Sequence, residues 1–132
     1  MKRRILAVLA FTMFVSGIQL YAHHSFSATY DQSKTVTIEG KVTQFLLRNP
    51  HSFLHIAVTG KDGKEETWNI EWAAAGQLGG AGVTRDSLKV GDPVVITGNP
   101  GRDAADQRLR MVTVKRTSDG FSWGFRQGQT VD

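Results

Sequence analysis

Hydrophobic and polar residues alternate along the segment 35–46, and this alternation predicts a β-strand. A period of two is typical of a strand with one buried face. Gly40 interrupts the pattern, at a kind of position where a bulge or a sharp barrel bend is common. The residues expected to face the core are Val36, Ile38, Val42 and Leu46.

Four further segments show strand patterns separated by turn residues. They are residues 51–58, 67–72, 93–97 and 109–115. An Asp-Gly pair at positions 62–63 marks a hairpin turn between the first two of these. Segment 73–82 breaks the alternation, because its alanines favour a helix while its glycines oppose one. We expect a short helix or a compact loop there.

The order of these elements predicts an all-β protein with a single small, five-stranded OB-like barrel. Its short helix or loop lies between strands three and four, as in the partly open Greek-key barrel of the OB-fold. A five-stranded meander or a small sandwich is the alternative. Trp68 and Trp72 share the phase of Ile70, which predicts core packing rather than a stacking platform. Phe121, Trp123 and Phe125 are spaced by two, which predicts a short closing strand packed on the barrel, with an exposed partner-binding patch as the alternative.

The first 22 residues have the order of a secretory signal peptide. A basic start at residues 2–4 is followed by the apolar run 5–15 and by a more polar stretch ending at Ala22. The run is too short to span a bilayer, which takes roughly 20 apolar residues. We therefore expect a signal peptide at 1–22, a lead-in at 23–34, the barrel at 35–116 and an aromatic-containing tail at 117–132. The mature protein would be periplasmic or secreted by a bacterium, without stable membrane insertion.

Removal of the signal changes the charge of the chain. The whole sequence carries a net +4, but three of its 16 basic residues and none of its 12 acidic ones precede residue 23, which leaves +1. So weak a charge gives no electrostatic footprint for a polyanion, and we expect no nucleic acid binding. Arginines and lysines at 108–116 lie among aspartates and indicate a solvated, mixed surface. The absence of cysteine leaves the core alone to stabilise the domain.

Two segments are distinctive, Ala22-His23-His24-Ser25-Phe26 and Asn49-Pro50-His51. They are the most specific part of a resemblance to one family of small secreted bacterial proteins, the domain of unknown function 6152. Residues 36–42, 68–71 and 84–92 extend the likeness across nearly the whole mature chain. The resemblance implies a secreted, single-domain, OB-like β-protein and implies no reaction. The glycine-rich segment 73–82 departs from the amphipathic helix expected of the family.

Cleavage after Ala22 would place a free α-amine on His23, next to His24. The amine and the His23 imidazole can close a chelate ring on one ion, and both lose a proton readily near neutral pH. His24 offers a second mode, through the amine, the intervening amide nitrogen and its own ring. A set of nitrogen donors suits Cu(II), with Zn(II) and Ni(II) behind it. The sequence thus predicts a metal site made by His23, His24 and His51, with a frayed, solvated terminus as the alternative.

His51 and His55 are not expected to bind the same ion. If both lie on one strand, about 13 Å separates their Cα atoms. His51, beside a turn, is the better ligand, and His55 is expected to be an outward residue without a role. A carboxylate from Asp31, Glu39 or Glu71 is a candidate to complete the shell, and the sequence does not rank the three.

The chain contains none of the motifs of serine hydrolases, zinc proteases, P-loop proteins or dinucleotide-binding enzymes. We therefore expect a non-enzyme, namely a periplasmic protein that binds a metal, most readily copper, for sequestration or hand-over. The alternative is a non-catalytic OB-like module that binds an unknown periplasmic protein or a glycan, with the histidines incidental. A copper oxygenase would also need an open coordination position and a substrate surface, and the sequence shows neither.

Overall fold

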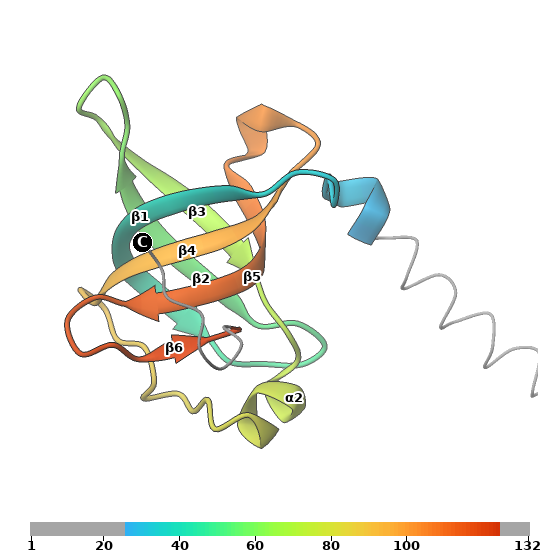
Figure 1. Cartoon of the computed structure of the whole chain (residues 1–132), viewed down its shortest axis with the longest axis vertical. Coiled ribbons are helices and arrows are strands. Elements are labelled where there is room, and N and C mark those ends of the chain that lie inside the picture. The colour runs from blue at the N-terminus through green and yellow to red at the C-terminus, as the bar shows by residue number, and fades with distance from the viewer. Residues whose placement is uncertain (1–25, 125–132) are drawn as a thin grey trace, which may run out of the picture.

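The computed structural model describes residues 26–124, and their main strands form a closed β-barrel (Figure 1). Neighbouring strands are antiparallel in the order β3-β2-β1-β4-β5-β6, and a short parallel pairing of β3 with β5 closes the barrel. The predicted five-stranded OB-like barrel is confirmed. The elements are β1 Val36–Leu46, β2 Phe53–Thr59, β3 Glu65–Glu71, α2 Ala75–Gly80, β4 Pro93–Pro100, η1 Ala104–Asp106, β5 Arg108–Arg116 and β6 Ser122–Trp123.

Strand β1 belongs to both halves of the barrel, pairing with β4 over residues 36–41 and with β2 over residues 41–46. Gly40 lies near this change of partner, where a Cβ atom would come within 2.3 Å of the Ala57 carbonyl oxygen. The bulge itself lies between Val42 and Gln44. It shifts the phase of the strand, so Phe45 packs against the core in place of the predicted Leu46. The prediction that Leu46 faces the core was wrong, because a bulge adds one residue to the strand and so changes the alternation after it.

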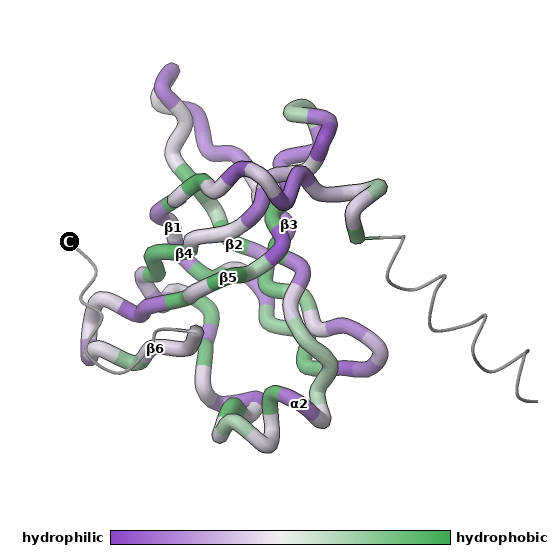
Figure 2. Tube along the Cα trace, turned by 45° about the vertical axis from the view of Figure 1, so that its right-hand side comes forward, coloured by the Kyte–Doolittle hydropathy of each residue, from purple (hydrophilic) through white to green (hydrophobic). Residues whose placement is uncertain are grey.

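The core fills the barrel with side chains from every main strand. Leu54, Ile56 and Ile70 are fully buried, and the hydrophobic residues of β4 and β5 meet them from the other side. Trp72 is buried and Trp68 is partly buried against the same cluster, as predicted. Figure 2 shows hydrophobic residues along the barrel strands and hydrophilic ones at the turn between β2 and β3.

The segment between β3 and β4 does contain a short helix, α2, which lies beyond one end of the barrel near β6 (Figure 1). Its buried Leu78 reaches the core, and the backbone N–H of Ala75 donates to the carbonyl of Arg48. The tail contributes the predicted closing strand, because β6 pairs with β5 and Trp123 packs edge-on against Trp72. Phe125 lies outside the described residues.

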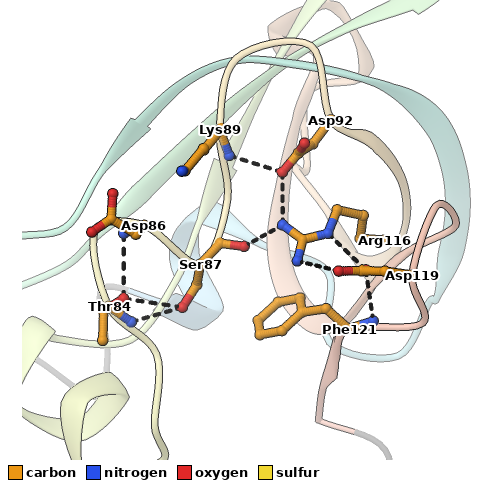
Figure 3. Close-up of polar contacts among 8 residues, drawn as sticks. All are labelled: Thr84, Asp86, Ser87, Lys89, Asp92, Arg116, Asp119 and Phe121. Carbon is orange, nitrogen blue, oxygen red and sulfur yellow. Dashed lines mark hydrogen bonds and ion pairs between the residues drawn. The ribbon is translucent and has the colours of Figure 1, made fainter.

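Arg116 ties three segments together at the end of β5 (Figure 3). Its guanidinium donates to the Asp92 carboxylate at 2.8 Å, to both oxygens of Asp119 and to the carbonyl of Ser87. Only 16% of this side chain is exposed. The solvated surface predicted for the 108–116 region is therefore wrong for Arg116, which replaces its water shell with charged partners. These contacts fix the 84–92 connector to the barrel.

The contacts of Arg116 with its carboxylate partners predict that the stability of the fold depends on pH. The Arg116 guanidinium, followed by the Phe121 N–H, lowers the pKa of Asp119 to about 2. A carboxyl whose folded pKa is depressed stabilises the fold above its unfolded pKa, about 3.9, and this contribution is lost as pH falls toward 2. Asp119→Asn should therefore melt below the wild type at pH 6, with a gap that closes between pH 4 and pH 2. Thermal melts followed by circular dichroism across this range measure the gap.

Asp86→Asn is the matched control, since it removes a nearby charge without removing any hydrogen bond to a described carboxylate. A melting gap for Asp119→Asn that stays constant from pH 6 to pH 2 would contradict the role given to Asp119.

Candidate functional site

The start of the described chain packs against the loop that joins β1 to β2. Residues 26–29 form a helical turn, and the ring of Phe26 lies 4.8 Å from the ring of His51. The turn is anchored by a bridge between Tyr30 and Gly101 and by the Arg102 side chain, which donates to the Ser27 carbonyl at 2.7 Å. The two motifs that identify the family resemblance, one ending at Phe26 and one ending at His51, therefore meet in space.

His51 is held by the continuation of the β2–β3 pairing beyond the strand ends. The buried Ser52 exchanges backbone hydrogen bonds with the 72–73 segment, and its hydroxyl bonds to the backbone of Arg48. A cis peptide bond joins Asn49 to Pro50 just before it. This fixed backbone presents the imidazole beside β3, where His51 Nδ1 lies 2.7 Å from a carboxylate oxygen of Glu71.

Glu71 also accepts a hydrogen bond from the Tyr30 hydroxyl at 2.5 Å, on its other oxygen. Its side chain is only 13% exposed, so the Tyr30 hydroxyl and the nearby His51 ring replace the water that burial removes. Burial, and then the bond to Glu71, hold the pKa of Tyr30 well above its ordinary value. The phenol therefore stays protonated and remains a donor. Tyr30, Glu71 and His51 form a chain of polar contacts from three separate parts of the sequence.

Of the three predicted metal ligands, the structure describes only His51, which lies in this chain of contacts. His23 and His24 lie outside the described residues. His55 faces outward on β2 and lines a different surface hollow with Arg85 and Lys89. Within residues 26–124 no group of three or more histidine, cysteine, aspartate or glutamate side chains is arranged to hold a metal ion.

The structure ranks the three candidate carboxylates. Asp31 is engaged by the Ser33 hydroxyl and then by Lys34, which lower its pKa to about 2. Glu39 is on β1, paired with Val95 of β4. Glu71 alone among them contacts His51. The sequence did not reveal Tyr30 as its partner, and the register of β2 with β3, which sets Glu71 opposite Phe53, is the signal that could have ranked Glu71 first.

Three arginines near this site lie over aromatic rings. Arg48 lies 4.9 Å from the centre of the Phe53 ring, Arg108 lies 5.6 Å from that of Tyr30, and Arg110 lies 4.3 Å from that of Phe26. Among the described residues none of the three forms an ion pair with a carboxylate. The positive charges of these three arginines are therefore not neutralised by a carboxylate in contact with them.

Solved structures share the fold of this chain. The crystal structure of the mitochondrial single-stranded DNA-binding protein Rim1 from S. cerevisiae (Form1) matches with a TM-score of 0.50 and 13% identity, covering 67% of this chain and 97% of that one. Form2 of that protein gives 0.49 and 16%, over 66% and 96%. A small single-stranded DNA-binding protein from Streptomyces coelicolor gives 0.39 and 17%, over 64% and 92%. The Form1 match supports the OB-like architecture, since single-strand-binding proteins are built on OB-folds.

This likeness overturns one expectation. Nucleic acid binding was excluded on the small net charge of the mature chain, yet a protein described as binding single-stranded DNA shares its fold. That exclusion was wrong because net charge averages over the whole surface and does not describe the charge of any one face.

Among residues 26–124 there is no helix long and apolar enough to cross a membrane. No curated protein matches this sequence. The family model described as "Family of unknown function (DUF6152)" matches residues 12–110, three quarters of the sequence. The resemblance noted in the sequence is thus confirmed, and the chain belongs to this family of unknown function.

Proposed function

We propose that this protein is exported, begins with His23 once its signal peptide is removed, and binds a metal ion through His23, His24 and His51. Cu(II) is the preferred ion, and sequestration or hand-over in the periplasm is the role. The single observation that carries the proposal is the contact between Phe26 and His51, which brings the N-terminal segment to the one histidine of the loop between β1 and β2.

Covalent geometry supports a shared site. Consecutive Cα atoms are 3.8 Å apart, so His24 can lie no more than about 8 Å from Phe26, and His23 no more than about 11 Å, measured between Cα atoms. The Phe26 ring already contacts the His51 ring. A histidine two or three residues earlier is therefore within reach of the same imidazole, although no described residue adds a third donor.

The contact with Glu71 prepares His51 for this role. Nδ1 faces the Glu71 carboxylate at 2.7 Å, so Nε2 is the nitrogen left to bind a metal. A carboxylate behind a histidine ligand fixes its tautomer and raises its basicity. The Tyr30 hydroxyl in turn holds Glu71 in place. With an amine and imidazoles as donors and no thiolate, Cu(II) has the highest intrinsic affinity.

The first prediction concerns the leading residue. Mass spectrometry of the exported protein should give a chain that begins at His23, and this chain should bind one Cu(II) ion in a calorimetric titration. His23→Ala and His51→Ala should each weaken binding by at least about tenfold, since each removes a nitrogen donor.

His55→Ala is the matched control, since it removes a histidine that lies apart from the contact between Phe26 and His51. The metal proposal fails if the exported chain begins elsewhere, or if the His23, His51 and His55 variants all bind copper as the wild type does.

The second prediction isolates Glu71. Glu71→Gln keeps the size of the side chain but removes the charge that orients His51, so Cu(II) affinity should fall about 10–100-fold. In the metal-free protein, nitrogen NMR of His51 should show Nδ1 protonated in the wild type and a mixture of tautomers in Glu71→Gln. Unchanged affinity together with unchanged tautomers would show that Glu71 does not position this ring.

A second candidate function is the binding of single-stranded nucleic acid, favoured by the arginines laid over aromatic rings. OB-folds bind oligonucleotides and oligosaccharides across strands two and three and the loops that flank them. Arg48 lies in the loop before β2, Phe53 begins β2, and Arg108 begins β5 after the loop that follows β4. The fold is also that of the single-stranded DNA-binding protein Rim1. Arginine and aromatic groups together suit unpaired bases and phosphates.

The third prediction tests this face. A fluorescent oligothymidine of about 15 nucleotides should bind in low salt and be released as salt rises, since phosphate contacts displace counterions. Arg48→Gln combined with Arg108→Gln should weaken binding at least about tenfold, whereas Arg85→Gln combined with Lys89→Gln, which removes equal charge elsewhere, should have a smaller effect. Absence of binding in low salt, or equal losses in the two double variants, rejects this second candidate.

A further inference from the structure

A cavity of about 360 Å³ lies between α2, the loop before β2, and strands β5 and β6. Figure 1 shows α2 and β6 near each other at one end of the barrel. Most of the wall is apolar, and its apolar lining includes Trp72, Leu78, Met111 and Trp123. Arg110, His51 and Glu71 also line it. An apolar cavity of this size with a few polar groups is typical of a small-molecule site.

Arg110 is the uncommitted charge of this wall. Glu71, its neighbour across the β3–β5 pairing, already bonds to His51 and Tyr30. Within the described part of the chain, no ion pair or side-chain hydrogen bond engages the Arg110 guanidinium, which only lies over the Phe26 ring. Stacking covers one face of the guanidinium and leaves its in-plane N–H donors for an anion.

Trp72 supplies an independent observation. It is 3% exposed, it belongs to the cavity wall, and its indole Nε1 has no hydrogen-bond partner among the described residues. A buried donor left unpaired costs roughly 1–3 kcal/mol, so this indole is held beside the cavity at some cost. The Trp123 ring packs at 76° to the Trp72 ring with 5.2 Å between centres, which adds aromatic surface beside it.

We propose that this cavity binds a small organic anion with a flat apolar body. A carboxylate pairs with Arg110, and the body packs against Trp72, Leu78 and Trp123. The site needs no metal and goes beyond the function proposed above. A neutral ligand leaves Arg110 without a partner, and a small hydrophilic anion leaves the apolar wall uncovered, so both are poorer ligands. The cavity therefore selects for charge and for apolar surface together.

Phenylacetate is the probe, with its neutral isostere phenylacetamide and with acetate as comparators. The full mature chain, freed of metal with a chelator, is titrated while tryptophan fluorescence and amide NMR shifts are followed. Phenylacetate should bind with a Kd of roughly 1 mM or below, a modest free energy of about −4 kcal/mol. Phenylacetamide and acetate should each bind at least about tenfold more weakly, because one lacks the charge and the other the apolar body. Because metal is absent, the result does not depend on the copper proposal.

Variants separate the cavity from other surfaces. Arg110→Gln should weaken phenylacetate at least about tenfold and leave phenylacetamide unchanged, since only the charged contact is lost. Arg85→Gln, on a different part of the surface, is the charge-matched control and should bind phenylacetate as the wild type does. Ala81→Leu adds bulk to the exposed rim of the cavity and should weaken both aromatic ligands while the fold is kept.

Three results would overturn the proposal. One is equal binding of phenylacetate and phenylacetamide, and another is no binding of any probe by a folded protein. The third concerns the tail, which follows Trp123 directly. If only a Phe125→Ala variant binds phenylacetate, the occupant is the chain's own tail.

Discussion

The polar contacts of Glu71 are the interaction on which the candidate site depends. A carboxylate that is 13% exposed needs partners in place of water, and it accepts a hydrogen bond from the Tyr30 hydroxyl and lies 2.7 Å from His51 Nδ1. These two residues come from the lead-in segment and from the loop before β2, so Glu71 fastens both to β3. The parallel pairing that closes the barrel sets Arg110 beside Glu71 and completes the group. Without this buried charge, the N-terminal segment would lose one of its polar contacts with the barrel wall.

Arg116 and Glu71 have the same structural role in two different parts of the molecule. Each carries a largely buried charge that contacts segments remote from one another in sequence. The two residues differ in whether the polar groups around them are left without a partner. The partners of Arg116 are two carboxylates and a carbonyl, all consumed by the contact, and the result is purely structural. Glu71 leaves the second nitrogen of His51 without a described partner, and the neighbouring Arg110 without an acid. Unused donors and acceptors of this kind are what a binding site requires.

Local patterns in the sequence predicted the barrel, because strand alternation and turn residues are properties of neighbouring positions. They also placed Trp72 in the core and Trp123 on a closing strand. The bulge after Val42 was not predictable from alternation, and it moved Phe45 inward. The site was predicted only in part. His51 was identified as a candidate from its place beside a turn, but its link to Tyr30 through Glu71 joins positions whose contact depends on the register of the closed barrel. No local pattern encodes that register.

The two candidate functions and the cavity share one short segment, and this constrains how they can coexist. Phe26 lies over the guanidinium of Arg110 and against the ring of His51. A metal ion held by His23, His24 and His51 would tighten the segment onto the barrel and keep Phe26 in that position. An oligonucleotide that stacked a base on Arg110 in place of Phe26 would have to displace that ring, and so would compete with the metal. A small anion in the cavity can use the in-plane donors of Arg110 without moving the ring above it. A metal ion and a small anion can therefore be bound at the same time. The positive ion and the negative ligand would then lie beside the same cavity wall.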